Sequence, residues 1–280
     1  MAFLAVLVLG VAAIVIALNL RDSSPAKPVR CAATLDGTDW YLSTEQADNA
    51  ALISAVAMRR GLPARAATIA IATALQESKL SNVSYGDRDS LGLFQQRPSQ
   101  GWGTHAQILD PEHSTNAFYD ALTKISGYQS LQITEAAQRV QRSAFPQAYA
   151  GHETQSRSWA SALTGYSTAA VTCTLRAAAR SVTDAQLEAF RTRVQRDWGT
   201  LALNRETDGW SADLTHAAWA AVDPSRGAWA FAQWNVAVAD GQGVTAVAVA
   251  DRQWSRSSGA WSTVGAGASL PTGTVRVTLG

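Results

Sequence analysis

The first twenty residues carry the feature that most restricts how this chain can fold. Residues 2–20 consist almost entirely of Ala, Val, Leu and Ile. A helix of about 19 residues is roughly 28 Å long at 1.5 Å per residue, which is sufficient to cross the hydrocarbon core of a bilayer. The sequence therefore predicts a transmembrane signal-anchor over residues 1–20, followed by a linker over residues 21–30.

A cleaved signal peptide is the main alternative to this anchor. We find no small-x-small cleavage site near Leu20, which favours an uncleaved segment. The distribution of charge argues for a cytoplasmic location, because Arg21, Lys27 and Arg30 follow the segment and no Lys or Arg precedes it. By the positive-inside rule alone, the residues after the segment would lie in the cytoplasm.

The two cysteines argue for the opposite location. Cys31 and Cys173 are the only cysteines of the chain, and they flank one predicted domain as a stapling disulfide would. Disulfides persist in oxidising compartments outside the cytoplasm. Because the chemistry inferred below also has its substrate outside, we expect a single-pass cell-membrane protein whose domains lie on the extracytoplasmic face.

The charge of the chain is close to balanced. The formal net charge is +1, charged residues make up 16% of the sequence, and no run of Lys or Arg stands out. Such a chain lacks the basic patch that binds phosphates, so we expect no nucleic-acid partner. One predicted span cannot form a transport pathway, which excludes a transporter. The sequence does not identify a protein partner.

Hydrophobic periodicity divides the remaining chain into two parts. Residues 31–173 are typical of a mostly helical domain, with an irregular hairpin region after its second helix. That helix is apolar almost all round over residues 67–72, which predicts a buried helix, and Glu77 stands at its end. Residues 174–280 mix helical and strand-like patterns and predict a small α+β module of unknown role. The expected fold class of the whole chain is α+β.

Glu77 is the strongest candidate for a catalytic residue. It is a lone acid at the end of the apolar helix, and a polar loop that could line a groove follows it. Cleavage of a glycosidic bond needs a carboxylic acid that keeps its proton near neutral pH, and apolar surroundings favour the protonated form. Many helices also end in a solvated Glu, so its position alone does not decide between the two roles.

The neighbours of Glu77 carry a family resemblance. The tripeptide 76–78, Gln-Glu-Ser, is followed by the segment 90–96, Ser-Leu-Gly-Leu-Phe-Gln-Gln. Together they resemble the Glu-Ser and Gly-Leu-Met-Gln motifs of soluble lytic transglycosylases and goose-type lysozymes, in the same order and at a similar spacing. The segment 75–103 also resembles lysozyme-like domains of actinobacterial secreted cell-wall proteins. The resemblance covers residues 48–165 and implies a lysozyme-like domain that cleaves the MurNAc–GlcNAc bond of peptidoglycan.

The resemblance also implies roles for individual residues. Glu77 becomes the general acid and base, and Ser78 orients it. Gly92 allows the backbone to approach the glycan closely. Gln95, with Gln96 beside it, lies against the sugar or its N-acetyl group.

A third family motif, Ala-Tyr-Asn-Ala-Gly, is matched only loosely. The segment 148–151 reads Ala-Tyr-Ala-Gly, so the Asn is absent. By the same resemblance, Tyr149 is predicted to bind substrate. The glycan strands of peptidoglycan are the expected binding partner of this domain.

A second carboxylate decides between two mechanisms. A hydrolytic muramidase of the inverting type needs a base about 6.5–9.5 Å from the acid, and Asp87 and Asp89 are the candidates. Turn formation is the ordinary role of Asp in such a loop. A lytic transglycosylase needs no second carboxylate, because the 6-hydroxyl of muramic acid attacks intramolecularly. We expect a transglycosylase; the alternatives are a hydrolytic muramidase and a non-catalytic peptidoglycan-binding or wall-assembly protein.

We expect neither a metal nor another cofactor. His105, His113 and His152 lack the spacing of metal ligands. The segment 209–213, Gly-Trp-Ser-Ala-Asp, faintly resembles zinc D-Ala-D-Ala carboxypeptidases, but Glu206 stands where their His ligand would be. The tryptophans of this part are expected to pack in the core rather than to form a sugar platform; they are Trp229, Trp234, Trp254 and Trp261.

Overall fold

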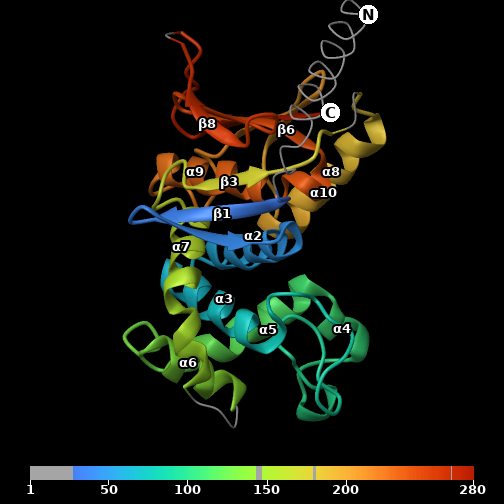
Figure 1. The fold of residues 1–280 in the computed structure, drawn as a ribbon, viewed down its shortest axis with the longest axis vertical. Helices are drawn as coiled ribbons and strands as arrows, with labels where there is room; N and C mark the ends of the chain where they lie inside the picture. The colour runs from blue at the N-terminus through green and yellow to red at the C-terminus, as the bar shows by residue number, and fades with distance from the viewer. Residues whose placement is uncertain (1–27, 143–146, 179–180, 266) are drawn as a thin grey trace, which may run out of the picture.

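The computed structural model describes residues 28–142, 147–178, 181–265 and 267–280. These residues form an α+β fold with nine α-helices, two short 3₁₀-helices and two antiparallel sheets (Figure 1). The larger sheet lies at one end of the molecule and the smaller sheet lies near its middle. The helices that precede residue 142 extend toward the opposite end.

A three-stranded antiparallel sheet brings together the two ends of the first part of the chain. Its order is β2-β1-β3, with β1 at Arg30–Leu35, β2 at Thr38–Leu42 and β3 at Val171–Thr174. Cys31 lies opposite Cys173 in the register of β1 and β3. The two residues form a disulfide across a sequence separation of 142, so the predicted pairing is confirmed. A disulfide indicates an oxidising, extracytoplasmic environment.

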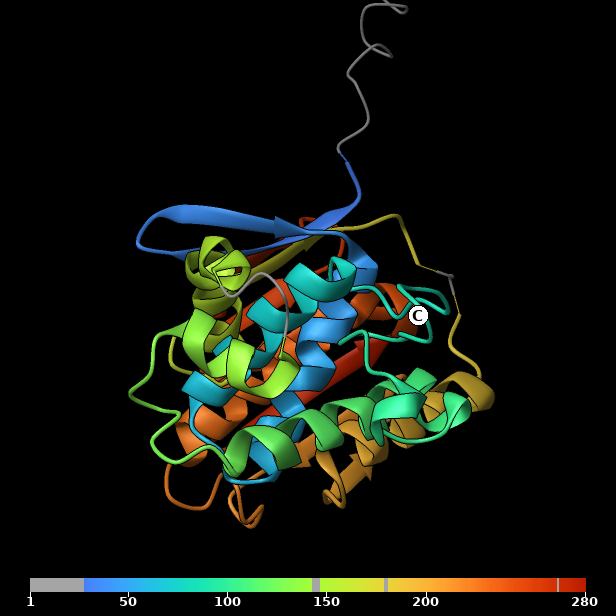
Figure 2. The same ribbon diagram turned by 90° about the horizontal axis from the view of Figure 1, so that it is seen from below.

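Six of the described α-helices lie between β2 and β3 in the sequence. Their bounds, with those of the 3₁₀-helices η1 and η2, are α2 Thr44–Arg59, α3 Ala64–Ser78, η1 Pro98–Gln100, α4 His105–Leu109, α5 Pro111–Thr123, α6 Ile133–Gln141, η2 Ala148–His152 and α7 Glu153–Leu163. Helix α3 packs against α2, α5, α6 and α7, and with α2 it occupies the centre of this helical part (Figure 2). Every residue from Ala66 to Leu75 is buried, which confirms the prediction for this apolar helix.

The second part combines three helices with a six-stranded antiparallel sheet. The helices are α8 Asp184–Trp198, α9 Pro224–Ala237 and α10 Ala239–Gln242. The sheet has the order β4-β5-β9-β6-β7-β8, and its strands are β4 Leu203–Arg205, β5 Gly209–Asp213, β6 Val244–Val249, β7 Arg252–Ser255, β8 Ala260–Thr263 and β9 Thr274–Leu279. Helix α9 lies between this sheet and β3 (Figure 1).

One continuous hydrophobic core joins the two parts. Helix α9 packs against β6 and β9 on one side and against α2, α7 and β3 on the other. Its fully buried Gln233 accepts hydrogen bonds from the backbone N–H groups of Ala170 and Val171. The same side chain donates to the carbonyl oxygens of Ala162 and Ser167. Because a buried amide left unpaired costs roughly 1–3 kcal/mol, these bonds fix α9 against the end of the first part.

The structure corrects the expected fold class in one respect and adds a sheet to the helical part. None of the described helices is long and apolar enough to cross a membrane, so the described part of the fold does not include the predicted membrane helix. Residues 1–20, for which it was predicted, lie outside the described residues. Helix α3, apolar almost all round, has 15 residues and a length of about 22 Å, and protein rather than lipid covers it.

The part that was expected to be mostly helical has six described helices and also a sheet that the sequence did not predict. It contains the three-stranded sheet β2-β1-β3 beside its helices. The strands of this sheet are only four to six residues long, so their alternation is too short to stand out in the sequence. Strand β3 also joins β1 from the far end of the domain, a pairing that no local pattern reveals.

Candidate active site

Glu77 lies in the last turn of α3, at a place where two remote segments meet. Lys79 ends the helix with a left-handed backbone conformation (φ 58°), and a largely irregular segment over residues 81–103 follows. In both views α3 ends between that segment and the region of α6 and η2 (Figures 1 and 2). Glu77 is half-buried there.

Among the described residues, the carboxylate of Glu77 has one hydrogen-bond partner, and that partner is neutral. Tyr149 of η2 is fully buried, and its hydroxyl donates to Oε1 of Glu77 at 2.6 Å. The other oxygen, Oε2, accepts no hydrogen bond from a described residue, and no described cation lies within salt-bridge distance. The two arginines of the following segment contact aspartates instead. The predicted site residues Glu77 and Tyr149 are thus brought together.

Ser78 fixes the segment that follows α3 rather than contacting Glu77. Its hydroxyl donates to the carbonyl oxygen of Leu93 at 2.8 Å and lies 3.1 Å from that of Ala74. Gln141 of α6 holds the next residue, because its side-chain amide donates to the carbonyl oxygen of Phe94 at 2.7 Å. Sequence reasoning missed Gln141, since no spacing rule connects residues 47 positions apart.

Gln95 and Gln96 lie in one tight turn, yet their side chains differ in burial. The backbone of Leu91 bridges that of Gln96 and closes the turn. Gln95 has a left-handed backbone (φ 47°), is half-buried, and donates to the carbonyl oxygen of Tyr85 at 3.2 Å. Gln96 is buried and donates to the carbonyl oxygen of Ser114 in α5. Gln95 is therefore available to a ligand, whereas Gln96 holds the turn against α5.

Gly92 is required by the protein's own packing. Its φ of 72° favours glycine, and a Cβ at this position would lie 2.7 Å from the carbonyl oxygen of Ile108. We expected a glycan to approach the backbone closely here. The backbone of Ile108 makes that close approach instead.

The two aspartates of the loop are placed differently from each other. The side chain of Asp87 is 91% exposed. Both oxygens of Asp89 are engaged, since Oδ1 accepts from Arg97 at 2.7 Å and Oδ2 accepts from the backbone N–H of Ser99 at 2.8 Å. Hydrogen bonds from Ser99 and then from Arg97 hold the pKa of Asp89 well below its usual range. A carboxylate with so low a pKa is a weak base.

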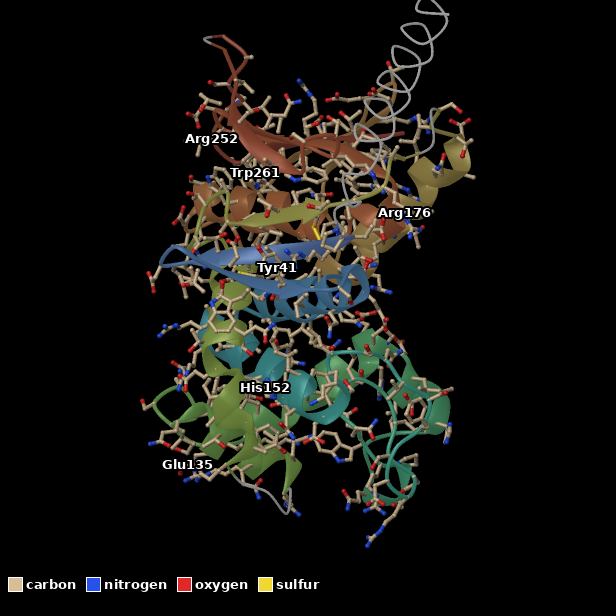
Figure 3. The ribbon with its side chains drawn as sticks, in the orientation of Figure 1. Tyr41, Glu135, His152, Arg176, Arg252 and Trp261 are labelled. Carbon is tan, nitrogen blue, oxygen red and sulfur yellow. A yellow bond between two sulfur atoms is a disulfide. The ribbon has the colours of Figure 1, made fainter. Side chains whose placement is uncertain are left out.

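His152 lies near Glu77, because its ring contacts the residue that precedes Glu77. It belongs to η2, in the lower half of the molecule and away from the six-stranded sheet (Figure 3). Its Nε2 lies 3.2 Å from Oε1 of Gln76, the residue before Glu77. Burial, and then the charge of Lys79, lowers the pKa of His152, so the neutral ring is favoured near pH 7. The sequence indicated only that His152 lacks the spacing of a metal ligand, and this contact with the end of α3 was not foreseen.

The C-terminal part contains no metal-ligand cluster within the residues that the structure describes. Its segment 209–213 is strand β5, where a Cβ on Gly209 would lie 1.9 Å from the carbonyl oxygen of Val277 in β9. Close strand pairing therefore accounts for this glycine. Glu206, at the position of the missing zinc ligand, pairs with Arg276 at 3.2 Å.

The tryptophans of the C-terminal part pack in the core, as predicted. Trp234 and Trp254 are fully buried, and Trp229 is 7% exposed. Trp261 is partly buried, its ring centroid lies 5.4 Å from that of Trp229, and its indole donates to the carbonyl oxygen of Val171 in β3. These rings join the two parts of the molecule, and they do not form an exposed platform.

Comparisons of the chain with protein-family models and with curated proteins find no match. The arrangement around Glu77 therefore carries the argument about function.

Proposed function

We propose that this protein cleaves the MurNAc–GlcNAc bond of peptidoglycan as a lytic transglycosylase, with Glu77 as the general acid and then the base. The observation that carries the proposal is the environment of the Glu77 carboxylate. One oxygen is fixed by the hydroxyl of buried Tyr149, and the other has neither a hydrogen-bond partner nor a counter-ion among the described residues. A carboxyl held in this way keeps one oxygen free to exchange a proton with a substrate.

The reaction needs only this carboxyl and the substrate. Glu77 donates its proton to the glycosidic oxygen as the bond from that oxygen to C1 of MurNAc breaks. The resulting carboxylate accepts the proton of the 6-hydroxyl of the same sugar while that oxygen bonds to C1. The products are a 1,6-anhydromuramyl end and a GlcNAc hydroxyl, and Glu77 is protonated again.

The placement of the two aspartates supports transglycosylation over hydrolysis. A hydrolytic inverting enzyme needs a second carboxylate that confines a water molecule. Both oxygens of Asp89 are engaged and its pKa is lowered, while Asp87 is almost fully exposed. The extracytoplasmic environment that the disulfide indicates is also the compartment in which peptidoglycan lies.

Product analysis tests the proposal. Wild-type protein incubated with purified peptidoglycan should release fragments with 1,6-anhydromuramyl ends, which mass spectrometry distinguishes from reducing ends. Glu77→Gln keeps the shape of the side chain but cannot donate the proton, so cleavage should fall by about 10²- to 10⁴-fold or more. Glu188→Gln, at a half-exposed glutamate of α8 that pairs with Arg191, is the matched control and should cleave normally.

Three results would overturn parts of the proposal. Reducing ends would show hydrolysis in place of transglycosylation. Normal cleavage by the Glu77→Gln protein would remove Glu77 as the acid. Binding of peptidoglycan by the wild type without any cleavage would favour the alternative function, that of a non-catalytic peptidoglycan-binding protein.

A further inference from the structure

A pocket lies at the opposite end of α3 from Glu77. It encloses about 270 Å³ between the beginning of α3, the middle of α7 and the loop that follows α7, and its lining residues are Ala64, Arg65, Thr68, Arg157, Ser161 and Tyr166. This volume is slightly below the range of roughly 300–1,000 Å³ that is typical of sites for drug-sized ligands. It is therefore suited to one or two amino-acid residues or a group of similar size.

One of the two arginines that line this pocket has no counter-ion among the described residues. Arg157 is exposed, and its side chain forms no hydrogen bond or salt bridge with a described residue. Glu153 lies four residues earlier on the same helix, but its carboxylate pairs with Arg65 at 3.4 Å. Arg65 also donates to the carbonyl oxygen of Leu131, while its buried Nε has no hydrogen-bond partner among the described residues. Glu153 is thus engaged by Arg65, and no described acid pairs with Arg157.

The remaining polar groups of the pocket are mostly occupied within the protein. The hydroxyl of Thr68 donates to the carbonyl oxygen of Ala64 in its own helix. The hydroxyl of Ser161 is bonded to that of Ser167 at 2.7 Å. The alanine, the threonine, the aliphatic stems of the arginines and the tyrosine ring therefore present mainly apolar walls, with donor groups at the edge.

Tyr166 is held in place although it is 62% exposed. The preceding residue, Gly165, has a φ of 81°, and a Cβ there would lie 2.0 Å from the carbonyl oxygen of Arg226. The loop therefore packs closely against the first turn of α9. The guanidinium of Arg226 lies 4.8 Å from the centre of the Tyr166 ring, which is a cation–π distance. The wall that Tyr166 forms is fixed before any ligand arrives.

These observations define the chemistry of a ligand. Arginine side chains are donors only and carry permanent charge, so the ligand must provide acceptor oxygens and negative charge. The apolar walls favour a small aliphatic group beside that anion. We propose that this pocket binds the carboxylate end of a short peptide with small apolar side chains, with Arg157 as the main charge partner.

The identity of the peptide rests on the proposed function, because peptidoglycan carries stem peptides that end in alanine. His152, directly before α7, contacts Gln76 next to Glu77, and later residues of α7 line the pocket at the beginning of α3. The twelve residue steps from Arg65 to Glu77 span about 18 Å of helix. An extended peptide of about five residues covers a similar length. One substrate molecule is therefore long enough to reach both sites.

Peptide binding tests the proposal directly. N-acetyl-D-alanyl-D-alanine is titrated into the full-length protein, and the dissociation constant is measured by ligand-observed NMR. Arg157→Gln should raise that constant by roughly tenfold or more, because a charge-assisted hydrogen bond is lost. The substitution is at an exposed residue that has no partner among the described residues, so folding should be unaffected. Arg252→Gln on the six-stranded sheet (Figure 3) removes the same charge elsewhere and should bind as the wild type does.

Glycerol phosphate is titrated in parallel to separate a carboxylate site from a general anion site. Peptide binding that depends on Arg157 and exceeds phosphate binding supports the proposal. Equal or tighter binding of glycerol phosphate overturns the assignment to a peptide. Absence of peptide binding, or equal binding by the Arg157→Gln protein, overturns the site itself.

The failure of this proposal can be distinguished from the failure of the proposed function. The Glu77→Gln protein should bind the peptide as the wild type does, whether or not it cleaves glycan. In cleavage assays, Arg157→Gln should raise KM for peptidoglycan that carries peptides and leave KM for peptide-free glycan strands unchanged. A wild-type protein that binds the peptide but cleaves no glycan would support the pocket and overturn the proposed function. A wild-type protein that cleaves glycan but does not bind the peptide would overturn only the pocket.

Discussion

Glu77 and Asp197 occupy equivalent positions in two helices, and their surroundings are opposite. Helices α3 and α8 each have 15 residues, and in each the acid stands one residue before the end. Asp197 is fully buried, with Oδ1 accepting from Arg196 and Oδ2 accepting from Arg193 and from the indole of Trp234. Glu77 is half-buried and accepts from a single tyrosine hydroxyl among the described residues.

The difference begins in the local sequence of the two helices. In α8 the residues four and one before the acid are Arg193 and Arg196, whereas α3 has Thr73 and Gln76 there. A residue four positions earlier lies on the same face of a helix. Helix α8 therefore supplies the counter-ions of its own acid, and α3 leaves its acid to partners from elsewhere. Glu77, whose helix provides no such cation, is therefore the acid that remains available for proton transfer.

Arg193 shows what the buried acid does for the fold. Its guanidinium also forms two hydrogen bonds with Asp48 of α2, at 2.8 and 2.9 Å. Burial alone would lower the pKa of Arg193, but Asp197 and Asp48 outweigh that effect and raise the pKa above its ordinary value. Arg193 therefore stays charged, and its pair with Asp48 links the second part of the molecule to the first.

The largest expected difference between the two acids is in stability. Asp197→Asn keeps the shape of the side chain but removes the charge that faces Arg193 and Arg196. Breaking a buried ion pair costs about 3–5 kcal/mol, and we expect the lower end because Asp48 still pairs with Arg193. Urea unfolding measures the loss. The matched Glu77→Gln protein should lose less than about 0.5 kcal/mol, as substitutions away from buried networks do. Equal losses in the two proteins would contradict the comparison.

Removal of the disulfide should lower stability without affecting either acid. Replacing Cys31 and Cys173 with serine opens a loop that spans 142 positions. The chain-entropy account gives about 2–4 kcal/mol for a typical disulfide and up to about 5 for so long a loop. We expect a lower midpoint of urea unfolding and, at a temperature where the variant is folded, unchanged glycan cleavage. An unchanged midpoint would show that the three-stranded sheet holds the chain ends without the bond.

Features that depend on neighbouring residues could be predicted from the sequence. The apolar run at 67–72 predicted a buried helix, and α3 is buried and ends at Ser78, directly after Glu77. Cys31 and Cys173 predicted the disulfide because the chain offers no other pair. These predictions rest on helix periodicity and on counting, which need no knowledge of tertiary contacts.

Features that depend on contacts between remote segments could not be predicted in the same way. The role of Gly92 was expected to involve a ligand, but the backbone of Ile108 fills that space. The bond from Gln141 to Phe94 and the burial of Gln96 arise from how the loop folds back onto α5 and α6. The contact of Tyr149 with Glu77 spans 72 positions, and only the loose family motif drew attention to this tyrosine.

The smallest expected effect comes from removal of the Tyr149 hydroxyl. It donates to Glu77, whereas arginines pair with Asp197. Tyr149→Phe keeps the buried ring and removes the only described donor to the Glu77 carboxylate. Because Glu77 is half-buried, water can replace that donor, so the stability loss should be about 1 kcal/mol. The carboxyl is then less well oriented, and kcat for peptidoglycan should fall about tenfold. We expect KM to stay unchanged, because Tyr149 is fully buried and its hydroxyl donates to Glu77. Tyr41→Phe removes an exposed hydroxyl on β2 (Figure 3) and should change neither constant. A raised KM with normal kcat would mean that Tyr149 contacts the glycan itself, and the positioning of Glu77 would then have to come from another residue.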